Sequence, residues 1–124
     1  MTSETLKTEA SPACQSPAII LVEPQLGENI GMAARAMANF SLDDLRLVAP
    51  REQWPNKEAW SAAAGASWII EDAHIYEDVG AAVADLHFVC ATTARIRDSV
   101  KQISAPQSAA SEMRSRSRAG QKCG

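Results

Sequence analysis

The sequence predicts an α/β domain: a mostly parallel, Rossmann-like sheet flanked by helices. Two observations carry this prediction. Short apolar runs alternate with segments of helical periodicity, which is the pattern of βαβ units. The runs are also continuous rather than alternating, as expected for strands covered on both faces. Because 46% of the 124 residues are hydrophobic, the chain has enough apolar surface for a buried core.

The first predicted element is a strand over residues 18–22, which Pro24 and Gly27 end. Residues 1–16, in contrast, are polar, with scattered Ser, Thr and Pro. We therefore expect residues 1–16 to be a disordered lead-in and residues 17–124 to form the folded part.

A helix is predicted next, with Asn29 as its N-cap. Its apolar stripe is expected to contain Ile30, Ala33, Met37 and Phe40. The run over 45–49, stopped by Pro50, predicts a second strand.

The later elements follow the same alternation. We expect a helix over 56–65, a short strand over 68–70, a helix over 78–86, a strand over 87–92 and a helix from Pro106 to about Arg118, ended by Gly120. The tail after Gly120 resembles the approach to another buried strand. We therefore expect this chain to be the N-terminal part of a longer domain.

Charge is unevenly distributed along the chain. Residues 1–94 hold five Lys or Arg against 13 Asp or Glu, whereas residues 95–124 hold seven against two. A basic tract of this kind binds phosphate or is simply a solvated helix face, and charge alone favours the second interpretation.

Several classes of protein are not favoured. The longest apolar stretch is too short to cross a bilayer, and the N-terminus has no signal-peptide core. Three cysteines without a close pair argue against a disulfide framework and a zinc site, and favour a reducing cytoplasm. We expect no metal site.

The segment from Glu28 to Met37 is the most informative one for chemistry. Arg35 lies early in the predicted helix and leans back over Gly31, which has no side chain to obstruct it. It can thus reach toward the carboxyl ends of the strands, where parallel sheets bind ligands, with Asn29 nearby. Alternatively, Asn29 is only a cap, Gly31 only a packing residue, and Arg35 a surface charge.

Thr92 and Thr93 directly follow a predicted strand, at the expected edge of the cleft. They either contact a ligand or only satisfy the exposed strand end, and the two readings are about equally supported.

Taken in order, these features resemble the SpoU/TrmH family of the SPOUT superfamily, and within it the bacterial tRNA-modifying branch, TrmJ. The family's first motif is Asn, one apolar residue, Gly, two or three small residues and then Arg, filled here by Asn29 to Arg35. Further matches are the strand at 45–49 followed by Pro50, the small residues 64–66, and Thr92 to Arg95. The resemblance covers residues 17–124.

The resemblance implies an S-adenosylmethionine-dependent transfer of a methyl group to an RNA ribose 2′-hydroxyl, with tRNA and its anticodon loop as the expected substrate. It implies catalytic roles for Asn29 and Arg35 and cofactor contacts for Thr92 and Thr93. It places Arg95 near RNA. Two later family motifs, which build the cofactor-binding knot and much of a homodimer interface, have no counterpart in this sequence, so we expect this stretch alone to be inactive.

Other basic residues are candidates for sequence-independent phosphate binding. They are Arg97, Lys101, Arg114, Arg116 and Arg118. Two rival hypotheses remain open: a non-catalytic RNA-binding module built on the same fold, and a flavodoxin-like or nucleotide-binding domain. The second is weakened because the sequence has neither a Gly-x-Gly-x-x-Gly loop nor a P-loop.

Overall fold

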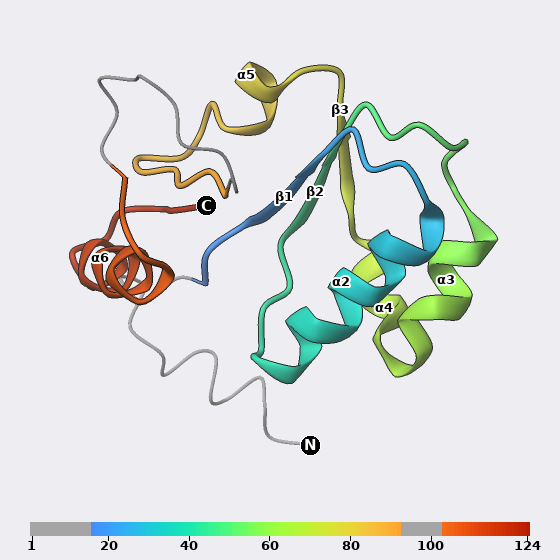
Figure 1. The fold of residues 1–124 in the computed structure, drawn as a ribbon, viewed down its shortest axis with the longest axis horizontal. Coiled ribbons are helices and arrows are strands. Elements are labelled where there is room, and N and C mark those ends of the chain that lie inside the picture. The colour runs from blue at the N-terminus through green and yellow to red at the C-terminus, as the bar shows by residue number, and fades with distance from the viewer. Residues whose placement is uncertain (1–15, 93–102) are drawn as a thin grey trace. The chain divides into compact units, whose positions relative to one another are not determined.

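The computed structural model describes residues 16–92 and 103–124 (Figure 1). The predicted disorder of residues 1–16 therefore falls almost wholly outside the described residues. The chain divides into two compact units, one from Ser16 to Asp85 and one that contains Leu86–Gly124.

The Ser16–Asp85 unit contains a three-stranded sheet and helices. In chain order its elements are β1 (Ile19–Val22), α2 (Gly27–Asn39), β2 (Leu45–Val48), α3 (Lys57–Ala63), the 3-10 turn η1 (Ala64–Ala66), α4 (Ser67–Glu71), β3 (His74–Tyr76) and α5 (Val79–Ala82). The predictions of a strand at 18–22, a strand at 45–49 and a helix at 56–65 are confirmed. The helix predicted over 78–86 is much shorter, because only Val79–Ala82 is helical, with Asp78 as its side-chain cap.

The sheet is parallel throughout, as predicted, in the order β1-β2-β3. All four residues of the central strand β2 are buried. Because side chains alternate along a strand, Leu45 and Leu47 face one side and Arg46 faces the other. The core contains Leu45 and Leu47 together with residues of α2, α3 and α4, which therefore cover the first face (Figure 1).

Helix α2 packs closely on α3, and the contact centres on Gly31. A Cβ placed on Gly31 would lie 2.3 Å from the carbonyl oxygen of Ala59 and 2.7 Å from the Cβ of Ala62. Both distances are far below van der Waals contact, so only glycine allows the two helices to approach this closely.

Two details predicted for α2 are wrong. Its N-cap is Leu26, and Asn29 is the third helical residue instead of the cap. The buried stripe is Ile30, Ala34 and Met37, whereas Phe40 is 77% exposed. The reason is that α2 begins two residues before Asn29 and ends at Asn39, so Phe40 lies beyond the last turn.

The strand predicted over 68–70 is also wrong, since these residues belong to helix α4. Buried positions in this stretch are Ala63, Ala66, Ile69 and Ile70, while Trp68 is exposed. Spacings of three and four residues are helical, and the run Trp68 to Ile70 is too short to display them by itself. The third strand comes later, at β3.

The face of the sheet opposite α2 and α3 holds a buried arginine that pairs with two partly exposed carboxylates. Arg46 is 4% exposed. Its guanidinium donates to both carboxylate oxygens of Asp85, at 2.6 and 3.0 Å, and to the carbonyl oxygen of Ala82, at 2.8 Å. It also donates to Asp44. These hydrogen bonds raise the pKa of Arg46 and attach the chain after α5 to the central strand.

The unit that contains Leu86–Gly124 is built around helix α6 (Pro106–Arg118), which is confirmed as predicted, with Pro106 at its first turn. Gly120 follows the helix with φ of 91°, a left-handed conformation suited to glycine. The strand predicted over 87–92 is reduced to a parallel bridge between Phe88 and Cys123. The chain after Gly120 therefore pairs with the segment that precedes Thr92.

Candidate functional site

The carboxyl ends of the strands form the sheet edge at which the sequence placed the site. The residues that directly follow β1 and β2 are Glu23 and Ala49, with φ of 49° and 44°. Non-glycine residues rarely adopt this left-handed conformation, and strain of this kind gathers at functional sites. Backbone hydrogen bonds fix the ends of these two strands. They run from Glu23 N to Val48 O at 2.7 Å and from Ala49 N to Tyr76 O at 2.9 Å.

Glu52 holds the N-terminus of α2 at this edge. Its Oε1 accepts hydrogen bonds from the backbone nitrogen of Gly27 at 2.8 Å and from Nδ2 of Asn56 at 3.0 Å. Asn56 in turn caps α3 by accepting from Ala59 N at 3.1 Å. A carboxylate at a helix N-terminus is stabilised by the helix dipole, so this group sets the starting positions of both helices.

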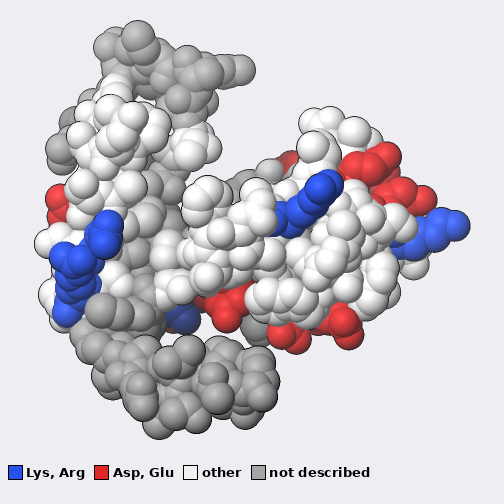
Figure 2. Space-filling model, turned by 90° about the horizontal axis from the view of Figure 1, so that it is seen from below, with Lys and Arg blue, Asp and Glu red and all other residues white. Residues whose placement is uncertain are grey.

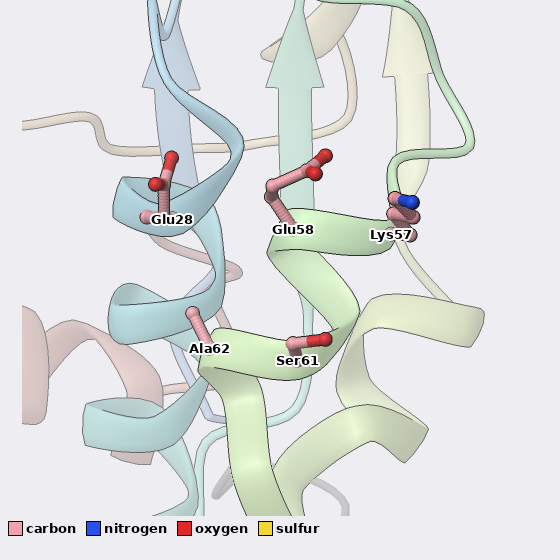
Figure 3. A pocket seen from close by; sticks show the side chains of 5 residues that line it. All are labelled: Glu28, Lys57, Glu58, Ser61 and Ala62. Carbon is pink, nitrogen blue, oxygen red and sulfur yellow. The ribbon is translucent and has the colours of Figure 1, made fainter.

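An open hollow lies between the first turns of α2 and α3 (Figure 3). Its lining is Glu28, Lys57, Glu58, Ser61 and Ala62. In Figure 3 the carboxylates of Glu28 and Glu58 both point toward the carboxyl ends of the strands. Two acidic groups against one lysine make this hollow unfavourable for phosphate.

Asn29 and Arg35 are both exposed on α2. They lie six residues apart, which is about 9 Å along the helix axis and about 120° around it. Among the residues that the structure describes, neither side chain makes a hydrogen bond or an ion pair. Arg35 is therefore available for a ligand.

The expectation that Gly31 leaves free space for Arg35 is wrong. The space is filled by the backbone of α3 at Ala59 and Ala63. Gly31 is thus a packing residue, which was the alternative interpretation. Any approach of Arg35 to the sheet edge must run over the exposed side of α2.

The predicted cofactor contacts are only partly placed. Thr92 is exposed and lies two residues beyond Cys90, whose backbone nitrogen donates to Gly124 O at 2.9 Å. Its hydroxyl can make one ligand hydrogen bond, which is compatible with a cofactor contact but does not define a binding site. Thr93 and the predicted RNA contacts Arg95, Arg97 and Lys101 lie outside the described residues.

The three arginines of α6 are not equivalent. Arg114 and Arg118 are exposed, whereas Arg116 lies 4.1 Å over the ring centroid of Phe88 and pairs with Glu112 at 2.7 Å. Arg116 also donates to Gln121 Oε1 at 3.3 Å. It therefore holds α6 against the paired segments 87–90 and 121–124.

Sequence reasoning missed two of these roles. Glu52 carried no signal, because a single loop carboxylate 25 residues from Gly27 cannot be recognised as its cap. Arg116 could have been separated from its neighbours, because Glu112 precedes it by four residues and Arg114 and Arg118 lie on the opposite face of the helix.

In the described ranges, no group of three or more His, Cys, Asp and Glu side chains is arranged to hold a metal ion. No helix among these residues has the length and apolar character needed to cross a membrane.

Two proteins similar to this chain are named as tRNA methyltransferases. Over 83 residues it is 41% identical to the tRNA (cytidine/uridine-2′-O-)-methyltransferase TrmJ of Escherichia coli K12, covering 67% of this chain and 33% of that protein. It is 39% identical over 75 residues to the tRNA (cytidine-2′-O-)-methyltransferase TrmJ of Methanocaldococcus jannaschii, covering 60% and 32%. The chain thus spans about a third of the length of these relatives.

A solved structure and a family agree with this similarity. The crystal structure of TrmJ from Z. mobilis ZM4 superposes with a TM-score of 0.77 at 56% identity, covering 80% of this chain and 44% of that one. The SpoU rRNA methylase family matches residues 16–114. The chain therefore belongs to the SpoU rRNA methylase family.

Proposed function

We propose that the protein carrying this chain transfers a methyl group from S-adenosylmethionine to a ribose 2′-hydroxyl of RNA, and that its substrate is the anticodon loop of a tRNA. The proposal depends on one observation above all. In this chain, which belongs to the family, the segment Asn29 to Arg35 lies in a helix that starts at the carboxyl edge of a parallel sheet. Among the described residues, Arg35 is exposed and unpaired. The names of the relatives support the choice of tRNA.

Arg35 acts as an electrostatic clamp in this proposal. A guanidinium group scarcely releases its proton, so Arg35 is a poor general base. It instead binds the phosphate next to the reacting ribose and stabilises the alkoxide that develops on the 2′-oxygen. The hydroxyl proton then passes to another group or to water, and Asn29 orients the ribose.

Bound S-adenosylmethionine supplies an activated methyl group, so the chain's own residues have to align the attacking oxygen and exclude other geometries. Thr92 and Thr93 would contact the cofactor, and Arg95, Arg97 and Lys101 would bind RNA phosphates. A homodimer in the cytoplasm completes the proposal. No metal is required, because the sulfonium already makes the methyl group reactive.

Replacing Arg35 tests the proposal. In the full-length protein, with tRNA and radiolabelled S-adenosylmethionine, Arg35→Ala should lower the methylation rate by at least about 100-fold, the usual loss when a transition-state charge contact is removed. Arg35→Lys should also fail, since a point charge does not reproduce the planar fork. The fold should be retained because Arg35 is exposed.

Asn39→Ala is the matched control, because Asn39 is an exposed polar residue one turn after Arg35, at the C-terminal end of the same helix. It should keep the wild-type rate. Wild-type turnover by either Arg35 variant would remove Arg35 from the mechanism.

A further inference from the structure

We propose that one face of α6 is a phosphate-binding stripe for RNA, made by Arg114 and Arg118 with Gln107 and Ser111, and that Arg116 takes no part in it. This inference rests on the proposed function and names the surface that holds the RNA backbone. Figure 2 shows Lys and Arg side chains gathered in a band on the α6 part of the molecule.

Helix geometry separates the two faces of α6. At about 100° per residue, the four stripe positions fall within roughly 60° of one another. All four are exposed. The opposite face is partly buried and contains Ala109, Met113, Arg116 and Ser117.

The stripe is cationic, and its charge is not cancelled locally. Among the described residues neither Arg114 nor Arg118 is paired. The single acidic residue of α6, Glu112, is bonded to Arg116 and lies well around the helix from the stripe. The side chains of the stripe are guanidinium, amide and hydroxyl groups, all of which donate hydrogen bonds to phosphate oxygens.

Arg116 is committed elsewhere. Its side chain is 37% exposed and is engaged by Phe88, Glu112 and Gln121. Moving it to a phosphate would break the cation–π contact, the ion pair and the hydrogen bond together. The charge of the Ser16–Asp85 unit supports α6 as the contact surface, because that unit has four Lys or Arg against 11 Asp or Glu.

The salt dependence of RNA binding measures how many phosphates the stripe contacts. Each phosphate contact contributes about 0.7 to the slope of log affinity against log salt for single-stranded RNA, so two contacts contribute about 1.4. Between 1 M and 0.1 M salt, this corresponds to about 25-fold in affinity. The protein is titrated with bulk tRNA over a range of salt concentrations, as wild type and as three variants.

The double variant Arg114→Gln with Arg118→Gln should flatten the slope by about 1.4. The double variant Arg114→Lys with Arg118→Lys should keep it, because counterion release requires only the charge. Arg116→Gln should also keep the slope, and its melting temperature shows separately any loss of stability. An unchanged slope in the double Gln variant, or a flattened slope in Arg116→Gln with its fold retained, overturns the proposal.

The binding of wild-type protein separates a failure of the proposed function from a failure of the stripe. Wild-type protein that binds no tRNA contradicts the proposed function, whereas wild-type binding that the double Gln variant retains contradicts only the stripe. Titration with anionic phosphatidylglycerol vesicles and with polyglutamate completes the test. If the double Gln variant lost binding only to the vesicles, the stripe would be assigned to a membrane instead of RNA. If it lost binding only to polyglutamate, the stripe would be assigned to an acidic protein.

Discussion

Replacing Gly31 with alanine tests how closely α2 and α3 must approach. The added Cβ would lie 2.3 Å from Ala59 O, 2.7 Å from the Cβ of Ala62 and 2.8 Å from Ala63 N. None of these atoms belongs to a flexible side chain that can turn away. Relieving the shortest contact therefore requires α3 to move by about 1 Å, which is strain of the kind that overpacked cores show.

The expected cost follows from two opposing terms. Overpacking costs about 1–3 kcal/mol, and the better helix propensity of alanine returns up to about 1 kcal/mol. Because all three contacts are shorter than 3.0 Å, the cost should lie in the upper part of its range, at about 2–3 kcal/mol. After the gain of about 1 kcal/mol from helix propensity, Gly31→Ala should lower the free energy of unfolding by about 1–2 kcal/mol. Urea denaturation followed by circular dichroism can measure this loss.

Gly65→Ala is the matched control for Gly31→Ala. Apart from its chain neighbours and the adjacent helix backbone, no atom of the described residues lies within 4 Å of a Cβ built at Gly65. Its effect should be between zero and a gain of about 1 kcal/mol, because alanine restricts the unfolded chain. If Gly31→Ala were as stable as wild type, the close packing of α2 on α3 would be refuted. Gly31 could then again be interpreted as the residue that leaves space for the side chain of Arg35.

Two further predictions concern buried groups. Arg46→Met should lower the free energy of unfolding by about 3 kcal/mol, because it removes the buried guanidinium that binds Asp44, Asp85 and the carbonyl oxygen of Ala82. Asp85→Asn should cost less than half as much, since the Asp85 side chain is 55% exposed. Equal losses of the two variants in urea denaturation would contradict the structure. Burial raises the pKa of the Cys123 thiol, so the folded state keeps a proton that the unfolded chain loses near pH 8.5. Stability should be full below that pH and be lost as pH rises toward the folded value, and urea midpoints from pH 7 to 10 should fall more in wild type than in Cys123→Ala.

The elements that the sequence predicted well are those whose signal lies within one segment. The run Leu45–Val48 is a buried parallel strand, and Pro106 and Gly120 mark the limits of α6. The strand predicted over 68–70 failed because two adjacent isoleucines favour a strand locally. Only the small residues Ala63 and Ala66 before them reveal the helical spacing.

The side-chain contacts that hold the fold and the candidate site were harder to predict because they are long-range. Arg46 reads as a charge inside an apolar strand, and its partner Asp85 comes 39 residues later. Glu52 likewise reaches back to Gly27 across an entire strand and helix. Contacts of this kind arise from the packing of elements, which a periodicity along one segment does not encode.

The Asn29-to-Arg35 segment shows how one short motif serves both the fold and the proposed chemistry. Helical periodicity places Ile30, Gly31 and Ala34 on the buried face of α2, where Gly31 packs against the backbone of α3. The same periodicity leaves Asn29 and Arg35 exposed. Since the two sets of residues alternate on one helix, the position of Arg35 depends on how closely α2 is seated on α3. A substitution at Gly31 should therefore affect methylation as well as stability, although Gly31 has no side chain to contact a substrate.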